Sequence, residues 1–188
     1  YRYRFLALEP DAAFGATAEI VCRMLQRTER GLTAITCTEE AWPVEMAVKN
    51  FEPVGRFQPV EDRPAWLAFP PFLEIVEYIE RQEFSELLIS SPGPLGLTGL
   101  LAARLLGLRT TGLCFDDLPS LVHEVTADEA MEQLTWRYVA WFFGQTDRII
   151  VPNEAYRRRL IDRGFDVGKL EVAADSDQSE YWKLVVAL

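Results

Sequence analysis

The stretch Leu87 to Gly96, Leu-Leu-Ile-Ser-Ser-Pro-Gly-Pro-Leu-Gly, decides the fold of this chain. Its first three residues are typical of a short buried strand, and the Pro/Gly turn after them leads into an apolar helical run from Leu97 to Leu106. A strand, a turn and a helix in this order place backbone N–H groups at a helix N-terminus, at the carboxyl edge of a sheet. Open α/β folds bind ligands at that edge, so we predict a binding loop that includes Ser91, Gly93 and Gly96.

The residues that follow the loop exclude one class of phosphate-binding site. They do not include Gly-Lys-Ser/Thr, so the loop is not a P-loop. Gly93 lets a ligand approach the backbone closely, which favours an anion or a sugar hydroxyl held by backbone donors. Two other interpretations stay open: Pro94 and its neighbours only start a helix, or the loop serves a small phosphoryl- or nucleotide-binding α/β enzyme.

Strand and helix signals alternate on both sides of the loop. Strands are predicted over residues 5–8, 32–37, 87–89, 110–114, 148–151 and 170–173. Helices are predicted around 20–25, over 72–79, 97–106 and 154–163, and as a long helix opened by Asp128. The segment Glu39 to Pro71 contains six prolines and is expected to be mostly loop, with short extended pieces such as Val54 to Phe57. The alternation predicts one α/β domain over residues 1–188, with a Rossmann-like, open, mainly parallel sheet and helices on both of its faces.

Two helices carry specific expectations about burial. The helix 97–106 is apolar nearly all round, which predicts that it lies between the sheet and another layer, and a missing partner domain is one candidate for that layer. In the long helix that Asp128 opens, the spacing predicts that four apolar residues lie on one face of the helix: Met131, Leu134, Tyr138 and Trp141. Helical spacing places its aromatic cluster mostly in the core, with a stacking platform for sugar or lipid as the alternative; the cluster is Trp136, Tyr138, Trp141, Phe142 and Phe143.

The composition is acidic and rich in apolar residues. With 188 residues, 49% of them hydrophobic, the chain is long enough to bury a core. Its formal net charge of −10 repels a phosphate backbone, which argues against nucleic acid as a partner. Its cysteines, Cys22, Cys37 and Cys114, form no CxxC pair and are typical of buried thiols in a reducing cytoplasm. The single histidine, His123, is interpreted as an ordinary loop residue, and no metal site or cofactor is predicted.

The chain is expected to be a piece of a longer cytoplasmic protein. It begins at Tyr1 rather than Met, and neither a secretory signal nor an apolar run near the roughly 20 residues of a membrane span is present. The run Arg157 to Arg159 is interpreted as a solvated helix face, with contact to anionic lipid headgroups as the alternative.

Two adjacent carboxylates come directly after the predicted strand 110–114, in the run Cys114 to Pro119. Asp116 and Asp117 are therefore expected at the carboxyl edge of the sheet, where a carboxylate serves as a general base or binds a hydroxyl group. Adjacent residues point in different directions, and Asp117 is the better candidate. An ordinary loop or helix-cap carboxylate is the competing interpretation.

Four stretches carry a resemblance that covers residues 87–165: Ile89 to Gly96, Gly112 to Pro119, Glu132 to Tyr138 and Val151 to Tyr156. Together they resemble the N-terminal domain of retaining, nucleotide-sugar-dependent glycosyltransferases with the GT-B fold, of the group 1 or family 4 type, particularly the lipid- and mannose-related members. Such enzymes have two Rossmann-like domains that face a cleft. The N-terminal domain mainly binds the acceptor, and the C-terminal domain binds the nucleotide sugar.

The resemblance implies that residues 1–188 are the acceptor-side domain only, inactive alone, in a protein that moves a hexose with retention. The partners would be a nucleotide-sugar donor, held by the absent second domain, and a sugar or lipid acceptor; peripheral contact with the inner face of a membrane stays open. Asp117 would be the catalytic residue, in contact with acceptor or donor hydroxyls. The substrate-binding residues would be Ser91, Gly93, Gly96, Asp116, Asn153 and Tyr156.

The chain departs from the family pattern at three places. Where these enzymes commonly have a histidine that touches the donor sugar, this chain has Phe115, which cannot supply the hydrogen bonds of an imidazole. No paired-glutamate nucleotide-sugar motif occurs before Leu188, and in the first 86 residues only Gly15 stands near the expected Gly-rich acceptor loop. These departures keep a second function open, that of a degenerate, non-catalytic binding module for a sugar, lipid or protein.

Overall fold

The computed structural model describes residues 4–7, 32–37, 47–58 and 67–173, and these residues form α/β structure. The chain divides into two compact units, Tyr1–Thr111 and Gly112–Leu188. The helix predicted around residues 20–25 lies outside the described residues, as do Gly15 and Cys22.

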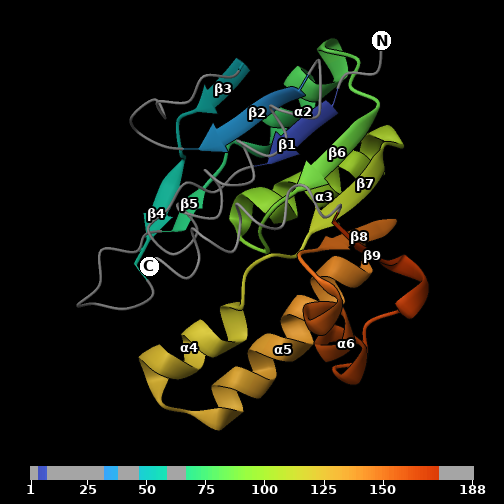
Figure 1. Cartoon of the computed structure of the whole chain (residues 1–188). Coiled ribbons are helices and arrows are strands. Elements are labelled where there is room, and N and C mark those ends of the chain that lie inside the picture. The colour runs from blue at the N-terminus through green and yellow to red at the C-terminus, as the bar shows by residue number, and fades with distance from the viewer. Residues whose placement is uncertain (1–3, 8–31, 38–46, 59–66, 174–188) are drawn as a thin grey trace. The chain divides into compact units, whose positions relative to one another are not determined.

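The first unit is built on parallel strands in the order β3-β2-β1-β6 (Figure 1). Strand β1 (Arg4–Ala7) lies between β2 (Leu32–Cys37) and β6 (Glu86–Ile89), and β3 (Ala47–Phe51) pairs with β2. Every residue of β6 is buried. Such strands are typically continuous apolar runs, because helices cover parallel sheets. The predicted α/β class with a mainly parallel sheet is confirmed.

The segment expected to be mostly loop contains more strand than predicted. Besides β3, it forms an antiparallel pair of short strands, β4 (Gly55–Phe57) and β5 (Leu67–Phe69). The extended piece expected at Val54 to Phe57 corresponds to β4, whereas β3 was not predicted. The prolines nearest to β3, Pro43 and Pro53, lie outside the strand rather than within it. Proline excludes a strand only where it removes a hydrogen bond of the ladder.

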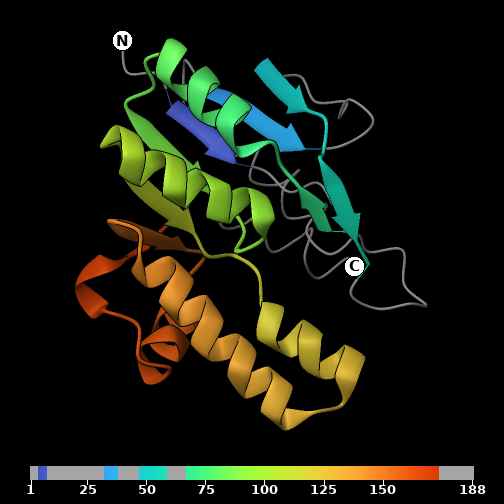
Figure 2. The same ribbon diagram turned by 180° about the vertical axis from the view of Figure 1, so that it is seen from behind.

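Helices α2 (Phe72–Arg81) and α3 (Pro94–Leu106) lie on the same face of this sheet (Figures 1 and 2). Helix α2 buries Ile75 and Ile79 and turns its charged residues outward, as its periodicity predicts. Of the layers predicted around α3, the sheet lies on one side, whereas Leu101 and Leu105 on another side are 53% and 67% exposed in this chain. Apolar composition alone does not show which side of a helix meets the sheet.

The second unit contains the end of β7 (Arg109–Leu113) and the parallel strands β8 (Arg148–Val151) and β9 (Leu170–Val172). Directly after β7, the N–H of Cys114 donates to the carbonyl of Ile150 in β8, at 2.9 Å. Helix α4 (Leu118–Thr126) packs against α5 (Glu129–Gly144), as Figure 2 shows. Helix α6 (Glu154–Asp162) and a short 3-10 helix, η1 (Val167–Lys169), connect β8 to β9.

The face of α5 that is buried is not the face on which the sequence analysis placed Met131, Leu134, Tyr138 and Trp141. Trp136, Val139, Phe142 and Phe143 are buried, whereas Met131, Leu134 and Trp141 are exposed. Of the aromatic cluster, Trp136, Phe142 and Phe143 are core as predicted and Tyr138 is half-buried. Trp141 is exposed and stacks on Tyr138, with ring centroids 6.0 Å apart. Both sets recur with helical spacing, so periodicity did not decide between them. Among the described residues, every helix is too short or too polar to span a membrane.

Candidate functional site

The predicted binding loop lies in the first unit, between β6 and α3. Gly93 is the N-cap residue of α3, its backbone is extended, and Pro94 occupies the first turn, so the helix starts without a side-chain cap. Ser91 is 2% exposed, and its Oγ has no hydrogen-bond partner among the described residues. Gly96 is buried in the first turn. The loop thus has the strand, turn and helix geometry that the sequence predicts.

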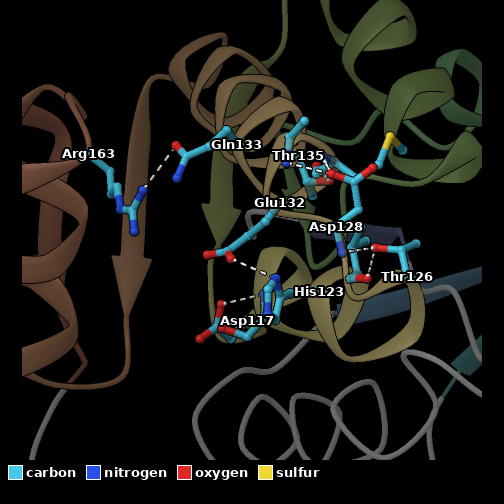
Figure 3. Close-up of polar contacts among 12 residues, drawn as sticks. Asp117, His123, Thr126, Asp128, Glu132, Gln133, Thr135 and Arg163 are labelled. Atoms are coloured by element: carbon cyan, nitrogen blue, oxygen red, sulfur yellow. Dashed lines mark hydrogen bonds and ion pairs between the residues drawn. The ribbon is translucent and has the colours of Figure 1, made fainter.

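Asp117 lies in the second unit and is the N-cap residue of α4 (Figure 3). Its Oδ1 accepts a hydrogen bond from the N–H of Ser120 at 3.3 Å, and its Oδ2 accepts one from Nη1 of Arg159 at 2.5 Å. The carboxylate is partly exposed. Since an ionised carboxylate has about four acceptor positions, these two contacts leave room for hydroxyl groups of a ligand.

Arg159 was not predicted to be a site residue, although its guanidinium group contacts three side chains. Besides its ion pair with Asp117, its Nη2 donates to Ser120 Oγ at 3.3 Å, and its guanidinium carbon lies 5.1 Å from the ring centroid of Trp136. Arg159 therefore connects the start of α4 with the buried face of α5. The run Arg157 to Arg159 is not one solvated face. Successive helical residues point about 100° apart, a signal that the sequence already contained.

Asn153 and Tyr156 lie at the start of α6, and Tyr156 contacts the segment after β7 that contains Asp116. Asn153 is the N-cap residue of α6, and its Oδ1 accepts from the N–H of Tyr156 at 2.8 Å. The Tyr156 hydroxyl donates to the main-chain carbonyl of Asp116 at 2.8 Å. Burial raises the pKa of Tyr156, and the nearby Cys114 and Asp117 add to the rise. The phenol therefore stays protonated near neutral pH and holds the loop after β7 in place.

Cys114 and Cys37 are both buried, in agreement with the sequence interpretation. Burial, and then the charge of Asp116, raise the pKa of the Cys114 thiol despite its hydrogen bond with Tyr156. A thiol with a raised pKa is not a nucleophile at neutral pH, because the thiolate is the reactive form. Phe115, at the position where the resemblance implies a histidine, is 7% exposed.

His123 lies within α4 rather than in a loop, which corrects the sequence expectation. Its Nδ1 is 3.2 Å from Oε2 of Glu132, so the pair connects α4 to α5 (Figure 3). Pro119 does not prevent helix α4, because proline is well tolerated in the first turn. Within the described part of the chain, no three His, Cys, Asp or Glu side chains gather as metal ligands do.

The structure therefore brings together four of the predicted site residues. Asp116, Asp117, Asn153 and Tyr156 meet at the end of β7 and the starts of α4 and α6. The carboxylate of Asp117 is partly exposed and is able to accept hydrogen bonds from hydroxyl groups, whereas Oδ2 of Asp116 is buried. The loop residues Ser91, Gly93 and Gly96 belong to the first unit.

Among solved structures, the chain is similar to Anabaena HepE in complex with UDP and glucose, with 12% identity and a TM-score of 0.62, over 98% of this chain and 50% of that one. It is also similar to the UDP-N-acetylglucosamine 2-epimerase of Rickettsia bellii, with 10% identity and a TM-score of 0.54 over 100% and 48% of the two chains. The same epimerase of Methanocaldococcus jannaschii gives 14% identity and a TM-score of 0.52, over 99% and 49%. The chain thus spans about half the length of these proteins, and the likeness shows the fold.

No curated protein sequence matches the chain at a significant level. The sequence model of Glycosyltransferase Family 4 matches residues 17–174, which include both the loop before α3 and the cluster around Asp117. This match covers most of the 188 residues. The chain belongs to Glycosyltransferase Family 4.

Proposed function

We propose that this chain is the acceptor-side half of a two-domain GT-B glycosyltransferase. The whole protein would move a hexose from a nucleotide sugar to a sugar or lipid acceptor, with retention of configuration. The family match over residues 17–174 is the observation that carries this proposal. It is supported by the fold shared with HepE, whose structure holds UDP and glucose, and by the half-length coverage of that protein.

The residues divide into two groups in this proposal. Asp117 is the catalytic residue and accepts hydrogen bonds from acceptor or donor hydroxyls, with Asp116 beside it. Asn153 and Tyr156 shape the edge on which Asp117 lies, by the hydrogen bonds that cap α6 and hold the Asp116 carbonyl. The loop with Ser91, Gly93 and Gly96 lines the acceptor side of the cleft. We place the protein in the cytoplasm, with peripheral contact at the inner face of a membrane if the acceptor is a lipid.

The 188-residue chain is expected to show no hexose transfer by itself. The donor would lose most of its binding groups without the second domain, and catalysis requires binding energy that is realised in the transition state. The measurement compares this chain with the full-length parent protein, using UDP- and GDP-hexoses with sugar and lipid acceptors. Turnover by the 188-residue chain at the parent's rate would contradict the proposed division of roles.

The second candidate is a degenerate, non-catalytic binding module, and the buried Phe115 is the observation that favours it. Under the transferase proposal, the native parent turns over and Phe115→His brings no gain. An imidazole buried at this site without a hydrogen-bond partner would instead destabilise the protein by about 1–3 kcal/mol. Initial transfer rates and urea unfolding of both proteins check this. Activity that appears only in Phe115→His would identify the native protein as a binding module.

A further inference from the structure

Ser120, in the first turn of α4, carries a hydroxyl group that its own helix does not use. A helical hydroxyl commonly donates to the carbonyl group four residues earlier. Thr126 in α4 and Thr135 in α5 do so, at 2.8 and 2.7 Å. The carbonyl four residues before Ser120 belongs to Asp116, and it accepts from the Tyr156 hydroxyl instead. The Ser120 hydroxyl therefore keeps a donor for a group outside the helix.

The Ser120 oxygen is nevertheless held in place by Arg159. Nη2 of Arg159 donates to Ser120 Oγ at 3.3 Å, and Nη1 of the same guanidinium donates to Oδ2 of Asp117 at 2.5 Å. Because this oxygen accepts from Arg159, its own O–H points in another direction, and in the part of the chain that the structure describes it meets no acceptor. A guanidinium presents its donors as a rigid, planar fork, so one group fixes both oxygens.

The side chains of this cluster are partly exposed at the surface and anchored from below. The side chains of Asp117 and Arg159 are 31% and 40% exposed, and Ser120 is half-buried. On the inner side, the guanidinium carbon of Arg159 lies 5.1 Å from the ring centroid of the buried Trp136, and a cation is attracted to the face of an indole. Asp117 and Ser120 thus offer an acceptor and a donor in fixed positions, which lowers the entropy cost of binding.

We propose that Ser120 binds a sugar hydroxyl beside Asp117, and that Arg159 is the positioning residue of both. An ionised carboxylate only accepts hydrogen bonds, whereas a sugar hydroxyl both donates and accepts. Asp117 accepts from the O–H of one sugar hydroxyl, and Ser120 donates to the oxygen of the same hydroxyl or of the adjacent one. The inference rests on the proposed function in one respect only, the choice of a hexose as the ligand.

The first arm of the test measures sugar binding by the full-length parent protein. Methyl α-D-glucopyranoside and methyl α-D-mannopyranoside are the probes, each compared with the analogues that lack one of its hydroxyl groups, by saturation-transfer NMR. Ser120→Ala is expected to weaken binding of a complete glycoside about three- to tenfold, as the loss of one hydrogen bond does. It is expected to leave unchanged the binding of the analogue that lacks the hydroxyl bound by Ser120.

Thr135→Ala is the matched control for this substitution. It also removes one hydroxyl from a helix, but that hydroxyl already donates within α5. We expect glycoside binding of Thr135→Ala to equal that of the native parent, and urea unfolding shows that both variants are folded. The site is refuted if neither glycoside binds the native parent, or if Ser120→Ala weakens binding of every analogue equally or no more than Thr135→Ala does.

The second arm tests the positioning role of Arg159. Arg159→Gln is expected to weaken glycoside binding about tenfold in the native background and less in the Ser120→Ala background, because both changes act on the same contact. Arg159→Lys keeps the charge without the planar fork and should restore only part of the loss. Arg158→Gln removes an exposed arginine that lies 3.7 Å from Glu154 Oε1 and should leave binding unchanged. Additive effects of Ser120→Ala and Arg159→Gln would contradict the positioning role, since a merely structural Arg159 gives no such coupling.

Glycoside binding does not depend on hexose transfer, so the binding site and the proposed function fail separately. A native parent that binds a glycoside through Ser120 but transfers no hexose refutes the transferase function and leaves the site in place. A native parent that transfers hexose, with Ser120→Ala and Thr135→Ala at equal rates, refutes the site alone.

Discussion

Asp117→Ala in the full-length parent protein is expected to lower kcat/KM for hexose transfer by about 10- to 100-fold. The carboxylate is partly exposed at the end of β7, and Arg159 and the start of α4 fix its position. Hydrogen bonds from substrate hydroxyls to a fixed, charged acceptor contribute about 1.5–3 kcal/mol, and about 1.4 kcal/mol corresponds to a factor of ten. Steady-state transfer rates of the native and mutant parents give the result.

A matched control separates this effect from the loss of a helix cap. Asp128 caps α5 as Asp117 caps α4, and its Oδ1 accepts from the N–H of Ala130 at 2.7 Å. Both alanine variants should lose about 1 kcal/mol of stability with the cap, and Asp117→Ala also loses the ion pair with Arg159, but only Asp117→Ala should lose transfer. Asp117→Asn keeps the capping oxygen and removes the charge, and we expect it to lose transfer as well. Unchanged kcat/KM in Asp117→Ala would remove the proposed role of this residue.

Gly112→Ala is expected to destabilise the second unit by about 1–3 kcal/mol, as overpacking of a dense core does. A Cβ atom at this position would lie 2.6 Å from Cδ1 of Phe143 and 3.2 Å from Oγ1 of Thr146. Phe143 is 2% exposed, and Thr146 Oγ1 donates to the Phe143 carbonyl at 2.7 Å, so neither neighbour moves easily. Urea unfolding with native and mutant chains measures the change as a shift of the midpoint at constant m.

Gly144→Ala is the control for the glycine substitution. Gly144 is the last residue of α5, and no atom of the described residues outside its own helix turn lies within 4 Å of a Cβ built there. Since alanine favours the helix over glycine by about 1 kcal/mol, this variant should be as stable as the native chain or more stable. Shortening the neighbour with Phe143→Leu should lessen the cost of Gly112→Ala. An unfolding midpoint of Gly112→Ala equal to that of Gly144→Ala would contradict the packing described at β7.

The strand, turn and helix around Leu87 to Gly96 were predictable because their signals are local. An apolar run ends at a Pro/Gly turn, and the structure places β6 before this turn and Pro94 in the first turn of α3. Strand β2 has the predicted bounds for the same reason. Asp128 as the cap of α5 was also readable, because a capping carboxylate needs only the next two or three residues.

The contacts between distant segments were not predictable from local patterns. Asp117 and Arg159 are 42 residues apart, and only the packing of α4, α5 and α6 brings them together. The exposure of Trp141 was misjudged because the apolar character of a helical residue does not show whether another element covers it. The N-cap role of Asp117 was an open alternative in the sequence, where a carboxylate after a strand suits both a cap and a binding site, whereas the N-cap role of Asn153 was not predicted.

The most direct test of the central claim is hexose transfer by the native full-length parent protein. The donor panel consists of UDP- and GDP-hexoses with sugar and lipid acceptors, and ¹H NMR reads the anomeric configuration of the product. The account predicts transfer from one of these donors, with the configuration of the donor retained in the product. No transfer from any of them, together with saturable binding of an acceptor, would contradict it and would identify the protein as a binding module.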